Sequence, residues 1–113
     1  MPYLVTAIIK PFKLEEVKEN LRAAGLLGMT VTEVSGFGRQ GGKTEAFRGT
    51  EYKMEFVPKV KVEVLVEASE LNKVIDLIAS SAHTGKVGDG KIWAYELKEL
   101  MRIRTSEKGD DAI

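Results

Sequence analysis

The sequence predicts an α+β fold in which four strands and two helices follow one another in the order β-α-β-β-α-β. Three observations lead to this prediction. Two segments repeat apolar residues at helical spacing, residues 60–67 alternate between two faces, and a long polar, glycine-rich stretch separates the two β-α-β halves. This order is typical of a ferredoxin-like βαββαβ sandwich, also called a split βαβ fold.

The first half covers residues 3–35. Residues 3–9 form an apolar, β-branched run that ends at Lys10-Pro11, where proline removes a backbone donor. A helix follows, with an apolar stripe made of Leu14, Val17, Leu21 and Ala24. Gly25 is expected to close this helix. Residues 29–35 are dense in threonine and valine, as a strand prefers.

The second half contains the clearest periodicity. Val60, Val62, Val64 and Val66 alternate with Lys61, Glu63, Leu65 and Glu67, so one face of this strand is expected to be buried. Ser69 is the expected N-cap of a helix whose apolar face is Leu71, Val74, Ile75, Ile78 and Ala82. Residues 91–97 supply the last strand. Two helices cover only one face of such a sheet, so we expect other copies of the chain to cover the second face.

Composition excludes or disfavours several classes of function. The 113 residues match one domain, 1–113, and the 17 basic and 17 acidic residues give no overall field that favours nucleic acid. No cysteine is present, so disulfides and thiolate metal sites are excluded. Neither a basic, apolar leader nor a run of about 18 apolar residues is found. We therefore expect a cytoplasmic protein that meets a membrane only through a partner.

The stretch 36–52 is too polar and too rich in glycine to be a buried element. Structureless loops beyond roughly 12–15 residues are usually functional or disordered, so we predict a functional loop on a rigid scaffold. Residues 36–41 also fit G-x-G-x-x-G, which favours a dinucleotide enzyme only if a helix opens at the third glycine. The following residues show no apolar stripe, so this interpretation is disfavoured.

A second glycine-rich segment, residues 84–91, contains three glycines and two lysines between a helix and a strand. Glycines let backbone amides approach a phosphate, and lysines add positive charge. Residues 85–91 match part of a Walker A motif, but Ile92 replaces the Ser or Thr that binds magnesium, and Lys91 opens a strand. From composition alone, a phosphate-binding loop and an ordinary glycine-rich turn remain equally open.

The remaining polar candidates are weaker. On an extended segment, Arg102 and Arg104 would face the same way, so both guanidinium groups could bind one phosphate. The alternative is that they form a solvated basic edge. His83, the only histidine, is expected at a helix end or on the surface. Trp93 and Tyr95 are expected in core or interface packing. No nucleophile-base pair emerges, which argues against an enzyme.

Residues 36–40, 47–52 and 84–93 resemble the PII family of nitrogen-regulatory signal proteins. The resemblance extends from residues 7–14 and 28–34 to 102–105 and 111–113. It implies a homotrimer with a long T-loop at about 37–56, a B-loop at about 83–91 and a C-terminal loop at about 102–113. It also implies binding of ATP or ADP, and of 2-oxoglutarate together with Mg-ATP.

The resemblance assigns the nucleotide site to two neighbouring subunits. Its residues would be Ile8, Gly28, Thr30, Gly36, Phe37, Gly38, Arg39, Gln40, Glu63, Leu65, Thr84, Gly85, Lys86, Val87, Gly88, Asp89, Gly90 and Lys91, with Arg102 and Arg104 reaching from the neighbour. The 2-oxoglutarate site would be Gly38, Gln40, Gly41, Gly42, Lys59, Val87 and Gly88. Gln40 would bind Mg²⁺ beside the ATP phosphates, and Lys59 would pair with the distal carboxylate of 2-oxoglutarate.

The resemblance further implies that ligands set the conformation of the T-loop and so control other proteins. These include an ammonium transporter, a nucleotidylyltransferase and nitrogen-assimilation enzymes. Tyr52 matches a tyrosine that is uridylylated or adenylylated, and Thr50 is a weaker phosphorylation candidate. The chain departs from the family pattern at Gly41, Phe47 and Thr50. The alternatives are a nucleotide-binding trimer without 2-oxoglutarate sensing and, more remotely, a small nucleotide-dependent enzyme.

Overall fold

The computed structural model describes residues 1–38 and 55–113. Its main elements are β1 (Pro2–Ile9), α1 (Leu14–Ala23), β2 (Thr30–Gly36), β3 (Val57–Glu67), α2 (Leu71–Ala82) and β4 (Lys91–Glu96). Short 3₁₀ helices at Pro11–Lys13, Ala68–Glu70 and Gly109–Ala112 connect or follow them. Each helix and strand predicted from the sequence is confirmed, with bounds shifted by one to three residues. No helix in the described ranges is long and apolar enough to span a membrane.

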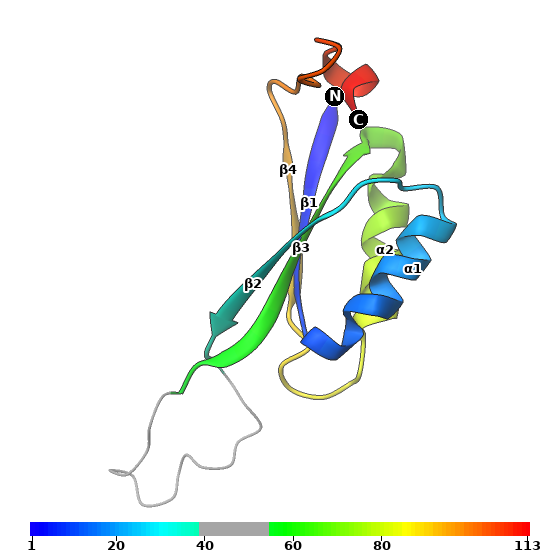
Figure 1. Cartoon of the computed structure of the whole chain (residues 1–113). Helices are drawn as coiled ribbons and strands as arrows, with labels where there is room; N and C mark the ends of the chain where they lie inside the picture. Colours follow the sequence, from blue (N-terminus) through cyan, green and yellow to red (C-terminus); the bar gives the residue numbers. More distant parts are fainter. Residues whose placement is uncertain (39–54) are drawn as a thin grey trace, which may run out of the picture.

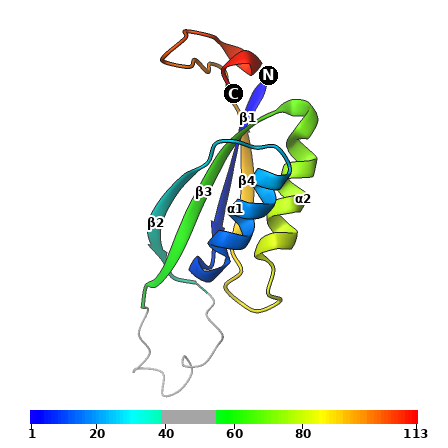
Figure 2. The same cartoon turned by 45° about the vertical axis from the view of Figure 1, so that its right-hand side comes forward.

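The sheet has the strand order β2-β3-β1-β4, and every neighbouring pair is antiparallel. Because β3 lies between β1 and β2, each β-α-β half is split by a strand of the other half. Both helices cover the same face of the sheet (Figures 1 and 2). The α+β, ferredoxin-like fold expected from the sequence is therefore confirmed.

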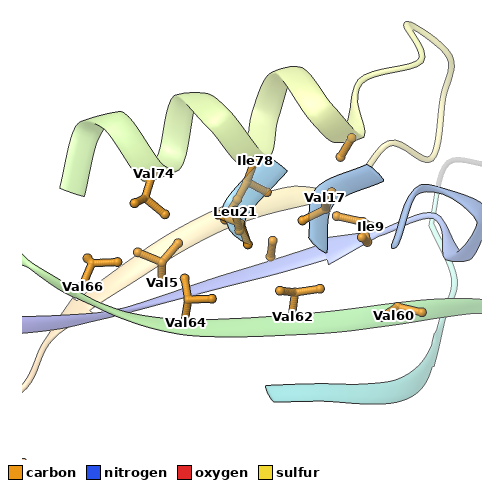
Figure 3. Close-up of a cluster of buried hydrophobic side chains, with 12 residues drawn as sticks. Val5, Ile9, Val17, Leu21, Val60, Val62, Val64, Val66, Val74 and Ile78 are labelled. Atoms are coloured by element: carbon orange, nitrogen blue, oxygen red, sulfur yellow. The ribbon is translucent and has the colours of Figure 1, made fainter. Parts of the chain in front are cut away.

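The core lies between this face and the two helices (Figure 3). Strand register places Val5 opposite Val64 and Ala7 opposite Val62, so alternate residues of β1 and β3 face the helices together. All of these side chains are at most 1% exposed. From the helices, the buried side chains are those of Val17, Leu21, Val74, Ile78, Ser81 and Ala82. The alternation read from residues 60–67 thus marks the buried face correctly.

The second face of the sheet is not covered by helices. Register places Trp93 opposite Thr6 and Tyr95 opposite Leu4 on this face. Trp93 is 39% exposed and Tyr95 is 61% exposed, so packing in the core of the chain is excluded for both. Large aromatic side chains that remain this open on a sheet face are suited to an interface.

Two local expectations differ from the structure. The helix α2 begins at Leu71 after a 3₁₀ turn, and Ser69 lies inside that turn without capping the helix. The strand β3 begins at Val57, although Pro58 cannot donate to a ladder. At Pro58, β3 pairs with β2 alone, because its pairing with β1 ends at Val60. Pro58 therefore lies at an edge of the sheet, where a missing backbone N–H is tolerated.

Candidate functional site

The segment between α2 and β4, residues 83–90, forms a tightly turned loop. Gly85, Gly88 and Gly90 have positive φ angles of 84°, 97° and 92°, which other residues rarely adopt. A Cβ at Gly90 would lie 1.7 Å from the carbonyl oxygen of Ile8, so the loop backbone packs directly against β1. These glycines were predicted from the sequence to allow close backbone approach, and here they also fix the path of the loop.

Asp89 folds this loop back on itself. The backbone amides of Thr84 and Gly85 each donate to the Asp89 carboxylate at 2.9 Å, and the Thr84 hydroxyl donates to it as well. These hydrogen bonds, led by that of the Thr84 side chain, hold the pKa of Asp89 well below the ordinary value of an aspartate. The carboxylate is therefore an internal anchor of the loop.

Two lysines from adjacent strands reach the same loop. The Lys10 ammonium lies 3.3 Å from the Asp89 carboxylate and donates to the Thr84 hydroxyl at 3.0 Å. The Lys59 ammonium donates to the carbonyl of Gly88 at 2.6 Å. Burial, and then the charge of Lys10, lower the pKa of Lys59, while Asp89 acts in the opposite direction. The loop thus carries two amines and one carboxylate at its base.

Lys10 is the member of this cluster that the sequence analysis missed. It had been read only as the residue that ends the first strand, 74 positions before Thr84. The available signal was strand pairing: Ile9 pairs with Val60, so the residues that follow and precede them, Lys10 and Lys59, emerge at the same edge of the sheet. Without the register, that proximity is not visible in the sequence.

A second group of predicted residues lies elsewhere. Gly28, Thr30, Glu63 and Leu65 line a groove of about 680 Å³ beside the connection from α1 to β2. Thr30 pairs with Glu63, so both side chains project from the uncovered face of the sheet. The other lining residues are Leu4, Ala24, Gly25, Leu26, Leu27, Met29, Val64, Val66, Glu67, Glu70, Val74 and Ile113.

Arg102 lies near this groove and is held by the C-terminal residues. Its guanidinium donates to the Glu107 carboxylate at 2.8 Å and to the main-chain oxygen of Ile113 at 2.7 Å. Residues 102–105 form a turn, closed by a bond from the Ser106 amide to the Arg102 carbonyl. The expectation of an extended segment with Arg102 and Arg104 on one side is therefore wrong, because the chain reverses here and Met101 pairs with Lys108.

The two groups of predicted residues are far apart within one chain. Lys59 and Leu65 lie on the same face of β3, six residues from each other, which corresponds to about 20 Å along a strand. The loop 83–90 lies at the end of the molecule opposite the two termini, and the groove lies toward the termini (Figure 1). One copy of the chain does not bring the two groups together.

Several predicted residues lie outside the described ones. They are Arg39, Gln40, Gly41, Gly42, Thr50 and Tyr52. At the border of the described residues, Phe37 and Phe56 pack edge to face, with ring centroids 5.3 Å apart. Within residues 1–38 and 55–113, no group of three or more His, Cys, Asp or Glu side chains could hold a metal ion. The expected magnesium ligand, Gln40, is among the undescribed residues.

Comparison with known proteins places this chain in a family. Residues 3–107 match the family model described as "Nitrogen regulatory protein P-II". The chain is 57% identical over 109 residues to a nitrogen regulatory protein P-II of Azospirillum brasilense, covering 96% of this chain and 97% of the relative. It is 54% identical over 110 residues to the nitrogen regulatory protein GlnK of Escherichia coli K12, covering 97% of this chain and 98% of the relative.

A solved structure agrees with these relatives. The crystal structure of Arabidopsis thaliana PII bound to citrate is 35% identical in sequence and superposes with a TM-score of 0.81. The similarity covers 99% of this chain and 92% of the Arabidopsis chain. The chain belongs to the PII family of nitrogen regulatory proteins.

Proposed function

We propose that this protein is a signal-transducing regulator of nitrogen metabolism, and not an enzyme, that binds ATP or ADP in clefts between the subunits of a homotrimer. With Mg-ATP bound, it would also bind 2-oxoglutarate. Ligand binding would change the conformation of the T-loop, about residues 37–56, and so control partner proteins. The proposed partners are an ammonium transporter, a nucleotidylyltransferase and other nitrogen-assimilation proteins.

The observation that carries this proposal is the loop 83–90. Its glycines expose the backbone, and within the described residues the amides of Val87, Gly88 and Asp89 donate no hydrogen bond. Consecutive amides without an acceptor, beside lysine ammonium groups, are suited to bind phosphate oxygens. Lys86 and Lys91, at the loop and at the start of β4, add further positive charge.

The separation of the two groups of predicted residues supports a site between chains. The groove residues Gly28, Thr30, Glu63 and Leu65 offer an apolar wall and hydrogen-bonding groups suited to a nucleobase. Along β3, Glu63 and Leu65 lie about 13 Å and about 20 Å from Lys59 at the base of the loop. The partly exposed aromatic side chains on the uncovered sheet face offer the contact through which neighbouring copies would join these halves.

Binding of 2-oxoglutarate is supported by Lys59, whose ammonium lies at the loop base. In the proposed arrangement it pairs with the distal carboxylate, and Gln40 with the ATP phosphates would hold Mg²⁺, a hard cation that favours oxygen ligands. The Arabidopsis relative was solved bound to citrate, itself a small polycarboxylate, which supports an effector of this chemical class. Uridylylation or adenylylation of Tyr52 would add bulk and charge to the T-loop.

The proposal is tested by isothermal titration of 2-oxoglutarate into the purified protein with Mg-ATP, and separately without nucleotide. The expected result is binding only in the presence of Mg-ATP, because the nucleotide phosphates complete the metal site. Lys59→Ala and Gln40→Ala should weaken 2-oxoglutarate binding much more than ATP binding. Equal losses of both ligands in these variants would contradict the assigned roles.

One observation favours a second candidate, a PII trimer that binds nucleotide without sensing 2-oxoglutarate. The Lys59 ammonium already donates to the Gly88 carbonyl at 2.6 Å, so one of its three donors is used within the chain before any carboxylate binds. Gly41 also replaces a lysine that the family pattern places beside the effector. Tight ATP binding without any 2-oxoglutarate binding would establish this candidate in place of the first.

A further inference from the structure

We propose that Lys10 is a positioning residue for the nucleotide. In this role it holds the loop 83–90 in the shape that presents backbone amides to phosphate oxygens, and it acts through Thr84 and Asp89 without touching the ligand. This inference rests on the proposed nucleotide binding and adds a residue to that site.

The burial and contacts of Lys10 fit a side chain that holds the loop 83–90 in place. Its side chain is only 17% exposed, although a free lysine would extend into solvent. Its ammonium reaches Asp89 at 3.3 Å and Thr84 at 3.0 Å, near the two ends of the loop. Lys10 directly follows β1, one of the two central strands of the sheet. One ammonium group thus fastens both ends of the loop to the centre of the sheet.

The charges of Lys10 and Asp89 connect this structural role to nucleotide binding. Asp89 places a negative charge inside a loop proposed to receive phosphate groups, and that charge alone would repel them. Lys10 lies against the same carboxylate and compensates it. Asp89 in turn accepts hydrogen bonds from the amides of Thr84 and Gly85, and the Lys86 amide donates to the Thr84 hydroxyl at 3.1 Å. Within the described residues, this turn leaves the amides of Val87, Gly88 and Asp89 without a hydrogen-bond acceptor. Removal of Lys10 would therefore both loosen the loop and uncover an opposing charge.

The inference predicts a specific pattern in a double-mutant cycle. Lys10→Met keeps the aliphatic stem and should weaken ATP binding about tenfold, a typical coupling for groups in one network. Lys10→Arg should restore most of the affinity. In an Asp89→Asn background, Lys10→Met should have little further effect, because the charge that it compensates is gone. Lys10→Gln serves as a second neutral variant if Lys10→Met lowers the unfolding temperature.

The matched control is Lys13→Met. It removes the same charge three positions away, where the ammonium pairs with Glu16 at 3.1 Å on α1 and contacts no loop residue. Its ATP affinity should stay within about twofold of the wild type. A ligand-free measurement adds a second readout: hydrogen exchange of the Thr84 and Gly85 amides by NMR should accelerate in Lys10→Met and recover in Lys10→Arg.

The outcomes separate this inference from the proposed function. An equal, tenfold loss in both backgrounds would overturn it, since Lys10 would then contact the ligand directly. Wild-type affinity in Lys10→Met would also overturn it while leaving nucleotide binding intact. Absence of ATP binding by the wild-type protein would instead refute the proposed function, and the positioning role with it.

Discussion

At the level of single residues, a few contacts determine the path of the backbone in the loop 83–90. Asp89, near the end of the loop, accepts hydrogen bonds from the amides of Thr84 and Gly85 near its start. Gly90 approaches β1 so closely that a Cβ would clash with the Ile8 carbonyl oxygen. The sequence correctly indicated a glycine-rich turn between a helix and a strand, and binding of an anion by this loop stays a prediction. It did not signal that the carboxylate of Asp89 is occupied by the loop itself, because this depends on the turn that Asp89 creates.

Asp89 makes loop stability depend on pH. Its pKa is lowered in the folded chain, so its contribution to stability is fully present above the ordinary aspartate pKa and is lost as the pH falls toward the folded-state value. The difference in unfolding free energy between wild type and Asp89→Asn should therefore be largest above about pH 5 and shrink below about pH 4. Urea unfolding at fixed protein concentration measures it. A difference that stays constant from about pH 5 down to about pH 3 would contradict the anchoring role.

At the level of elements, hydrophobic periodicity predicted both helices and β3, while an apolar, β-branched run predicted β1 and threonine and valine content predicted β2. The buried side of β3 followed from its alternation, and the apolar stripe of α1 from Val17 and Leu21, because burial depends on side-chain period. The start of α2 was mispredicted at Ser69 because a 3₁₀ turn precedes the helix. Contacts between elements were not predictable, since they depend on packing geometry that has no sequence period.

One such contact joins the two helices. The Asn20 amide on α1 donates to the Ser81 hydroxyl on α2 at 2.7 Å, and Ser81 is 2% exposed. Ser81→Ala should lower the unfolding free energy by about 1 to 2 kcal/mol, because it leaves the Asn20 amide without its acceptor.

The matched control is Ser80→Ala, since the Ser80 hydroxyl donates to the same Leu77 carbonyl but is exposed. Its effect should stay within about 0.5 kcal/mol. Urea unfolding of both variants gives the comparison, and equal losses would show that the link between helices does not stabilise the fold.

At the level of the whole molecule, the candidate site is divided between opposite ends of one chain. The sequence identified most of its residues through resemblance, but not how they are distributed in space. Lys59 and Leu65 share a face of β3 and still lie about 20 Å apart. Arg102 was expected on an extended segment. It lies instead at a turn, where its guanidinium donates to the Glu107 carboxylate. No local sequence pattern predicts this turn. Only the strand register reveals which residues one chain brings together.

The division of the site predicts that two defective copies can complement each other. Lys91→Ala should damage the loop half, and Arg104→Ala the half that reaches from the neighbour. Each variant alone should bind ATP weakly. If every site takes one half from each of two chains, random co-assembly of equal amounts should leave about one quarter of the sites with both halves intact.

The most direct measurement is therefore an isothermal titration of ATP into such a mixture, prepared by unfolding and refolding the two variants together. Wild-type protein treated in the same way sets the reference affinity and stoichiometry. We expect sites of wild-type affinity to appear in the mixture at about one quarter of the wild-type number. A mixture that binds ATP no better than its two components, although the refolded wild type binds, would contradict a nucleotide site shared between chains.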